Sequence, residues 1–182
     1  MIGLFIGSFN PPTKAHIEIG NLILKQKLVD RIIYIPVYNE KKLLDLNTRI
    51  NMLNLVINSN MEVSSIMNNY HYFDYNVLKK LKEKYTNIKI IMGSDLLLKL
   101  KDFNNLNQLL EFNYIIVPRF NINILEEINK YYPNYQNHFE ILNYSSDISS
   151  TNVKNSLEKN INNGLDKKVY DYIIKNNLYK EE

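Results

Sequence analysis

The chain has 182 residues, 45% of them hydrophobic and 23% charged, which is ordinary usage for a globular protein of one domain. It contains no cysteine, which excludes disulfides, thiolate catalysis and cysteine-based zinc sites. Its formal net charge of +3 requires no nucleic-acid partner and also suits anionic small molecules.

Short apolar runs alternate with helical patterns along the whole chain. In chain order they predict a strand at 2–6, a helix at 17–28, a strand at 32–35, a helix at 50–57, a strand at 61–66, a helix at 73–85, strands at 88–92, 114–117 and 139–142, and a helix at 167–176. The alternation predicts an α/β fold: a Rossmann-like, doubly wound parallel sheet of the nucleotidyltransferase type, in one domain over residues 1–182. Near-continuous apolar strands fit a sheet that helices cover on both faces.

Two stretches, 38–47 and 121–137, have the weakest periodicity. The first is polar and contains Lys41 and Lys42. It fits equally well a loop that closes over a substrate and a plain solvated loop.

A loop rich in glycine and proline follows the first predicted strand and runs from Gly7 to His16. In an open parallel sheet, ligands bind at the carboxyl ends of the strands, where this loop would lie. Gly7 lets a backbone pass close to a ligand, and the two prolines stiffen the loop. His16 falls near the start of a helix, where amide donors and the helix dipole favour phosphate. Such a loop suits phosphoryl transfer, which depends mainly on positioning and electrostatic stabilisation.

The loop resembles the signature G-x-F-[DN]-P-P-[HT]-x-G-H of the nucleotidyltransferase superfamily. The matching positions are Gly7, Phe9, Asn10, Pro11, Pro12, Thr13 and His16. Ala15 replaces the usual glycine, and Thr13 replaces the first histidine, as in the pantetheine-phosphate branch. The resemblance implies that His16 and Thr13 are catalytic and contact the phosphates of ATP. It also implies ATP contacts for Gly7, Ser8 and Phe9 and an acceptor contact for Asn10.

A second motif near the other end of the chain runs from Asp147 to Lys154 and resembles the superfamily element I-S-S-T-x-x-[RK]. Ser150 or Thr151 can cap a helix, and Lys154, one turn further on, can reach the same phosphate. The resemblance implies ATP binding by Ser149, Ser150, Thr151 and Lys154, with Lys154 also catalytic. Alone this signal is weak, because capping sequences are common; with the first motif it becomes strong.

The intervening segments resemble nicotinate mononucleotide adenylyltransferases. The segments that carry the resemblance are Arg49-Ile50-Asn51-Met52-Leu53, Phe73-Asp74, Gly93-Ser94-Asp95, Pro118-Arg119 and Asn177-Leu178-Tyr179. On the ATP side, this implies that Gly93 and Asp95 hold a ribose and that Arg119 binds ATP. On the acceptor side, it implies Lys41 or Lys42 at the mononucleotide phosphate, Tyr72 near the nicotinate carboxylate and Phe103 beside the nicotinate ring.

The activity that the resemblance implies is adenylyl transfer from ATP to nicotinate mononucleotide, giving nicotinate adenine dinucleotide and pyrophosphate in NAD biosynthesis. Magnesium would bridge phosphate oxygens, and we expect no metal ligands from the protein. Other readings are transfer to nicotinamide mononucleotide or phosphopantetheine, and an inactive nucleotide-binding sensor.

The expected partners are small molecules, ATP and a mononucleotide. No apolar run approaches the roughly 20 residues that span a bilayer, so we expect no membrane partner. The first residues lack the pattern of a signal peptide, and we expect a cytoplasmic protein. The sequence does not determine the oligomeric state and allows a homo-oligomer.

Overall fold

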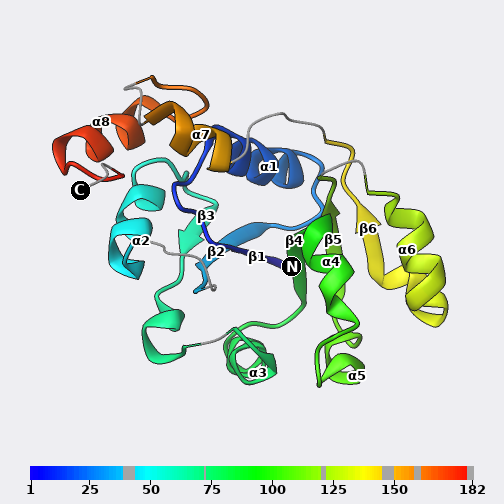
Figure 1. Ribbon diagram of the computed structural model, residues 1–182. Coiled ribbons are helices and arrows are strands. Elements are labelled where there is room, and N and C mark those ends of the chain that lie inside the picture. The colour runs from blue at the N-terminus through cyan, green and yellow to red at the C-terminus, as the bar shows by residue number, and fades with distance from the viewer. Residues whose placement is uncertain (39–43, 72, 120–121, 145–149, 158–160, 180–182) are drawn as a thin grey trace.

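The computed structural model describes residues 1–38, 44–71, 73–119, 122–144, 150–157 and 161–179. At its centre is a six-stranded sheet in the order β3-β2-β1-β4-β5-β6, and every strand pair is parallel. The strands are β1 (Ile2–Gly7), β2 (Arg31–Pro36), β3 (Met61–Val63), β4 (Ile88–Gly93), β5 (Asn113–Val117) and β6 (Phe139–Ile141). The parallel sheet confirms the predicted α/β class (Figure 1).

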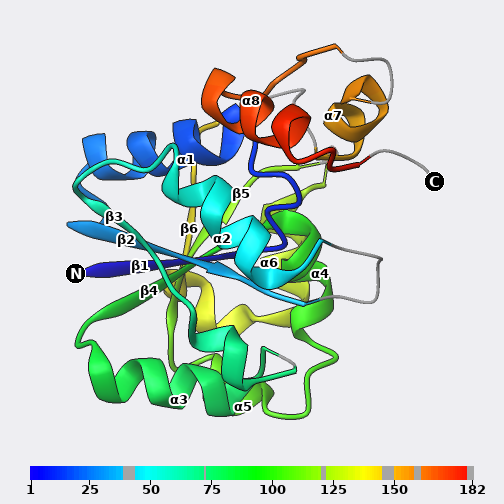
Figure 2. The same cartoon turned by 90° about the vertical axis from the view of Figure 1, so that its left-hand side faces the viewer.

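Helices lie against both faces of this sheet (Figure 2). The α-helices are α1 (Lys14–Lys25), α2 (Leu46–Asn54), α3 (Tyr75–Lys84), α4 (Ser94–Leu100), α5 (Leu106–Leu109), α6 (Ile124–Tyr131), α7 (Ser150–Leu157) and α8 (Lys167–Lys175). Two short 3-10 helices are η1 (Ile66–Asn69) and η2 (Pro133–His138). Among the described residues, no helix has the length and apolar character needed to cross a membrane.

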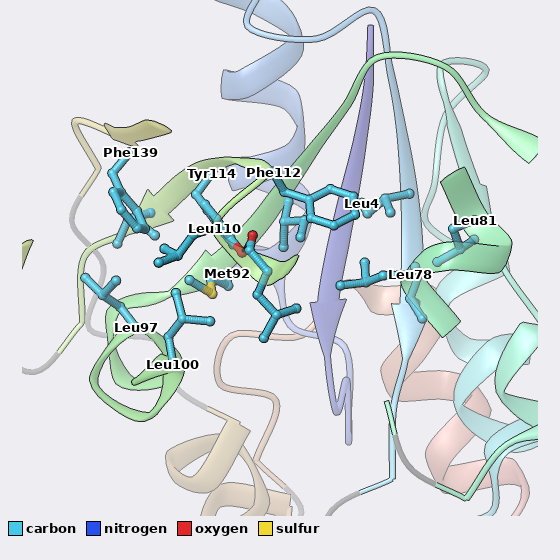
Figure 3. Packing of buried hydrophobic residues seen from close by; sticks show 14 of the residues in the cluster. Leu4, Leu78, Leu81, Met92, Leu97, Leu100, Leu110, Phe112, Tyr114 and Phe139 are labelled. Atoms are coloured by element: carbon cyan, nitrogen blue, oxygen red, sulfur yellow. Dashed lines mark hydrogen bonds between the residues drawn. The ribbon is translucent and has the colours of Figure 1, made fainter. Parts of the chain in front are cut away.

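Successive strand residues are buried on opposite faces, which explains the unbroken apolar runs in the sequence. In β1, Leu4 packs in the cluster formed with α3 to α6, whereas Phe5 packs in the cluster formed with α1. Figure 3 shows the first cluster, in which Leu4 and Met92 from the sheet meet Leu78 and other helical side chains. The two cores hold the sheet rigidly between its helices.

Side-chain caps set several helix starts that apolar periodicity alone places differently. The carboxylate of Asp45 accepts the amide of Thr48 and starts α2 earlier than the predicted 50–57 helix. Asp74 caps α3 in the same way. The predicted strand 61–66 ends at Val63 and is followed by η1. The weak stretch 121–137 contains α6, whose cap is Asn123.

The order of the strands marks the place where a ligand binds in such a sheet. After β1 the chain builds outward through β2 and β3, then returns to form β4 on the other side of β1. The loops that leave β1 and β4 therefore diverge, and the crevice between them is the usual binding site of an open parallel sheet. The predicted motifs at Gly7 and Gly93 lie at these two strand ends.

The C-terminal helices have a small core of their own. Val153 and Leu157 of α7 pack with Val169 and Ile173 of α8 and with Met52 of α2. The loop between α7 and α8 reaches the start of α1, where the carbonyl of Gly164 accepts the amide of Lys14 at 2.9 Å. An N-terminal and a C-terminal segment of the chain therefore meet beside the loop that follows β1.

Candidate active site

The loop after β1 is shaped by a buried aromatic ring. Phe9 is 1% exposed, has a positive φ of 45° and packs edge-on against His16, with 5.0 Å between ring centroids. A Cβ atom on Gly7 would lie 3.0 Å from the ring of Phe9. Glycine at this position therefore lets the ring of Phe9 pack without crowding. Because the ring of Phe9 is buried, any contact with ATP would be made by the backbone of this residue.

Thr13 holds His16 at the start of α1. The backbone N–H of Thr13 donates to Nδ1 of His16 at 2.9 Å, and the threonine hydroxyl lies 2.8 Å from the same nitrogen. Since an amide can only donate, Nδ1 must be unprotonated, and in the neutral ring the proton is on Nε2. The backbone amide of residue 13 therefore fixes the tautomer of His16, and the threonine hydroxyl adds a second contact to the same nitrogen.

His16 is 8% exposed, and its environment keeps it neutral. Burial, and secondly the positive charge of Arg119, lower the pKa of His16 to about 3. At neutral pH the imidazole therefore carries no charge and has one N–H donor, at Nε2. Arg119 follows β5 and is close enough to influence His16, so the ends of β1 and β5 contribute to one site.

Two of the first amides of α1 are used within the protein. Lys14 donates to Gly164, and His16 donates to the carbonyl of Thr13 at 3.1 Å. The expectation that the start of this helix presents its amides to a phosphate is therefore wrong for these two groups. The side chain of His16 is a further donor at this end of the helix.

Ser94 connects the ends of β4 and β5, and the motif at Gly93–Asp95 had not singled it out as a site residue. Its side chain is fully buried, accepts the amide of Arg119 at 2.9 Å and donates to the carbonyl of Arg119 at 3.0 Å. The Nη1 atom of Arg119 lies 3.9 Å from Oδ1 of Asp95. A Cβ atom on Gly93 would lie 2.3 Å from that same Oδ1 and 3.1 Å from the Arg119 side chain. Gly93 and Ser94 therefore set the positions of Asp95 and Arg119.

Arg49 is the most unusual group near the loop. In the sequence it was identified only as part of a family motif, and no role in the site was predicted for it. It is 0% exposed, and its Nη1 donates to the carbonyls of Ser8 at 2.6 Å and Val37 at 2.9 Å. Its Nε donates to the carbonyl of Leu44 at 3.0 Å, whereas Nη2 has no hydrogen-bond partner among the described residues. Burial lowers the pKa of Arg49, and no salt bridge to a described carboxylate compensates its charge.

Asn10 provides a second unpaired donor beside Arg49. Its Oδ1 accepts the amide of Leu44 at 3.3 Å and the hydroxyl of Tyr179 at 2.7 Å. Its Nδ2 is buried and has no hydrogen-bond partner in the part of the chain that the structure describes. Unpaired buried donors are uncommon in native proteins, so these two atoms are candidates for contact with a ligand.

The cytidylyltransferase-like family matches residues 4–156 of the chain. A curated protein of Endomicrobium trichonymphae, named "Probable nicotinate-nucleotide adenylyltransferase", is 31% identical over 98% of this chain and 98% of its own length. The chain belongs to the nicotinate-nucleotide adenylyltransferase family.

Further relatives agree with this membership. An Acholeplasma laidlawii protein of the same name is 28% identical over all of this chain and 98% of its own. The solved structure of Plasmodium falciparum nicotinic acid mononucleotide adenylyltransferase complexed with NaAD has 27% identity and a TM-score of 0.78. That likeness covers 98% of this chain and 96% of the Plasmodium chain. The family resemblance and the nucleotidyltransferase-type fold predicted from the motifs are both confirmed.

Several residues that the sequence resemblance assigned to the site cannot be located in it. Lys41, Lys42, Tyr72 and Ser149 lie outside the described residues. Ser150 and Thr151 begin α7, but their side chains are not described. Phe103 follows α4 and is 38% exposed. The structure therefore leaves their predicted roles as predictions.

Lys154 is linked to the first motif through Tyr179, near the C-terminus. Its Nζ lies 5.6 Å from the ring centroid of Tyr179, whose hydroxyl donates to Asn10.

Among the described residues, no group of three or more histidines or acidic residues is arranged to hold a metal ion.

Proposed function

We propose that this chain transfers the adenylyl group of ATP to the phosphate of nicotinate mononucleotide, forming nicotinate adenine dinucleotide and pyrophosphate for NAD biosynthesis. The observation that carries the proposal is the full-length likeness to the Plasmodium enzyme complexed with NaAD. The names of the bacterial relatives support it. In the reaction, an acceptor phosphate oxygen bonds to the α-phosphorus of ATP, and the bond from that phosphorus to the β-phosphate oxygen breaks. No protein nucleophile takes part.

On the ATP side, the proposal assigns His16 as the donor to a phosphoryl oxygen. Its Nε2–H is available because Nδ1 already accepts the amide of Thr13. Arg119 and Lys154 would contribute positive charge as the pyrophosphate leaves. Thr13 is 2% exposed, so a positioning role fits it better than a direct phosphate contact. The Asp95 carboxylate and the Gly93 backbone would hold a ribose.

On the acceptor side, Nη2 of Arg49 and Nδ2 of Asn10 would donate to the phosphate of the mononucleotide. A phosphate satisfies both unpaired donors and compensates the buried charge of Arg49. Both groups are buried, so a covering side chain must move before a phosphate reaches them. Tyr38 is the candidate, because it is 42% exposed and its ring centroid lies 5.8 Å from Cζ of Arg49.

We propose that magnesium arrives with the phosphates of ATP. The ion usually keeps several waters and binds substrate phosphates together with one or two carboxylates. Bound magnesium would neutralise charge on the phosphates.

The test is a pyrophosphate-release assay with ATP and each of three acceptors: nicotinate mononucleotide, nicotinamide mononucleotide and phosphopantetheine. We expect the highest kcat/KM with nicotinate mononucleotide and a dinucleotide product of the corresponding mass. Activity with phosphopantetheine alone would overturn the choice of acceptor. Binding of ATP without pyrophosphate release with any acceptor would indicate the inactive sensor.

The matched variant for this assay is His16→Ala. We expect turnover to fall by about 10²–10³-fold, the usual effect of removing a donor to transition-state charge, while circular dichroism stays unchanged. An unchanged rate would contradict the role of His16.

Three further expectations stay predictions: the single domain over residues 1–182, the cytoplasmic location and a homo-oligomeric state.

A further inference from the structure

The segment after α8 turns back into the site through a helix-ending motif. The amide of Leu178 donates to the carbonyl of Ile173 at 3.0 Å, and the amide of Asn177 donates to that of Ile174 at 3.2 Å. Asn177 has a φ of 51°, the left-handed conformation that this Schellman arrangement requires. Leu178 packs in the small core of α7 and α8. The turn therefore fixes where the next residue, Tyr179, points.

Tyr179 touches both sides of the site from this position. Its hydroxyl donates to Oδ1 of Asn10 at 2.7 Å, across 169 residues of sequence. Its ring centroid lies 5.6 Å from Nζ of Lys154, within range of a cation–π interaction. Burial raises the pKa of Tyr179, so the phenol remains a donor at neutral pH. Its φ of 60° is rarely adopted by a bulky residue, which indicates that the surrounding contacts hold it there.

The amide of Leu44 defines which way the side chain of Asn10 faces, and the Tyr179 hydroxyl reinforces that orientation. The amide of Leu44 must meet an oxygen, so the atom 3.3 Å from it is Oδ1 and the unpaired atom is Nδ2. The Leu44 contact is long, whereas the Tyr179 contact is short. Without the phenol, only the long hydrogen bond from Leu44 would hold the Asn10 side chain in the orientation that leaves Nδ2 free to donate to a ligand.

We propose that Tyr179 is a positioning residue that joins the acceptor side of the site to the ATP side. Its hydroxyl orients Asn10 so that Nδ2 can donate to the acceptor phosphate, and its ring places the ammonium of Lys154. This rests on the proposed function for the identity of the two substrates. The two effects are separable, because phenylalanine keeps the ring and loses only the hydroxyl.

The experiment compares Tyr179→Phe, Tyr179→Leu and a matched control, Tyr172→Phe. Tyr172 packs in the same small core, and no hydrogen bond of its hydroxyl is found among the described residues. The measurements are KM for each substrate, kcat, the Kd of nicotinate mononucleotide by calorimetry and the melting temperature. For Tyr179→Phe we expect KM and Kd for the mononucleotide to rise about 3–10-fold, the loss of one hydrogen bond, and KM for ATP to stay within about twofold.

Tyr179→Leu should show the same acceptor defect and, in addition, a KM for ATP raised about 3–10-fold, because the ring beside Lys154 is gone. Tyr172→Phe should match the wild type in all four measurements. An unchanged mononucleotide Kd in Tyr179→Phe would overturn the proposal, as would equal losses in Tyr179→Phe and Tyr172→Phe. If Tyr179→Leu does not fold, the Phe variant decides. Wild-type protein that binds the mononucleotide but transfers nothing would count against the proposed function, and the Kd comparison would still test Tyr179.

Discussion

The backbone amide of Thr13 donates to Nδ1 of His16, and the Thr13 hydroxyl lies 2.8 Å from the same atom. Both contacts are buried, since Thr13 is 2% and His16 8% exposed. A threonine at this position cannot supply a positive charge, but its hydroxyl can help to orient the ring, whose tautomer is set by the backbone amide. The chain thus replaces one histidine of the signature with a group that positions the other.

Thr13→Val keeps the shape of the side chain and the amide contact but removes the hydroxyl. We expect kcat for adenylyl transfer to fall about 3–10-fold, because one hydrogen bond that orients His16 is lost. Thr13→Ser keeps a hydroxyl and should restore most of the rate. Steady-state kinetics of the three proteins provides the comparison, and a valine variant as fast as the wild type would exclude the positioning role.

The lowered pKa of His16 predicts how stability depends on pH. The pKa is about 3 in the folded chain and 6.5 as a free imidazole, so between these values only the unfolded chain binds the proton. The free energy of unfolding therefore rises with pH in this window, by up to roughly 1.4 kcal/mol per pH unit. The contribution of the neutral His16 ring to the free energy of unfolding is fully present above pH 6.5 and is lost as the pH falls towards 3.

His16→Gln removes this titration. Urea unfolding of both proteins at pH 4, 5, 6 and 7 should show the wild type losing stability faster than the variant as pH falls. The carboxylates titrate in both proteins, so the difference between the two free energies reports His16. Parallel pH curves for the two proteins would mean that His16 is not buried as a neutral ring.

Ser94→Ala tests the link between the ends of β4 and β5. The change leaves both the amide and the carbonyl of Arg119 without the Ser94 hydroxyl. We expect the free energy of unfolding to fall by about 1–2 kcal/mol and KM for ATP to rise about 3–10-fold. Ser64→Ala, after β3 at the far edge of the sheet, removes a comparable contact to the amide of Ile66 and is the control. Equal KM values for ATP in both variants would contradict a role for Ser94 in placing Arg119.

The elements that the sequence predicted well are those whose signal is local. Buried parallel strands such as β1 and β5 are continuous apolar runs, and their positions agree with prediction to within one residue. The short helices α4 and α5 were not predicted, because seven and four residues are too few to show a helical period. The helix α6 was missed in a polar stretch that only its tertiary packing on the sheet makes stable.

The parts of the site that could be predicted are those whose residues are contiguous in the sequence. The loop from Gly7 to His16 lies at the predicted strand end, yet the hydrogen bond between Thr13 and His16 is visible only in three dimensions. Arg49 gave one usable signal: it shares a helix face with the buried Leu46 and Leu53. A charged residue on an apolar face needs partners, but nothing in the sequence shows that they are carbonyls 12 and 41 residues away.

Arg49→Lys keeps the charge but not the geometry of the guanidinium. One ammonium group cannot donate to the carbonyls of Ser8, Val37 and Leu44 and also present a further donor to a phosphate. We expect the free energy of unfolding to fall by about 2–3 kcal/mol and the Kd of nicotinate mononucleotide to rise at least about tenfold, while KM for ATP stays within about threefold.

The control for this prediction is Arg31→Lys, which makes the same change in an exposed pair with Glu62. Calorimetry gives the Kd, and the rise in melting temperature on adding the mononucleotide gives a second measure of binding, because a ligand that binds only the folded state stabilises it. That rise should be much smaller in Arg49→Lys than in the wild type or in Arg31→Lys. If the mononucleotide protects all three proteins equally, the unpaired Nη2 of Arg49 is not part of the acceptor site, and its buried charge serves only to hold the loop after β1.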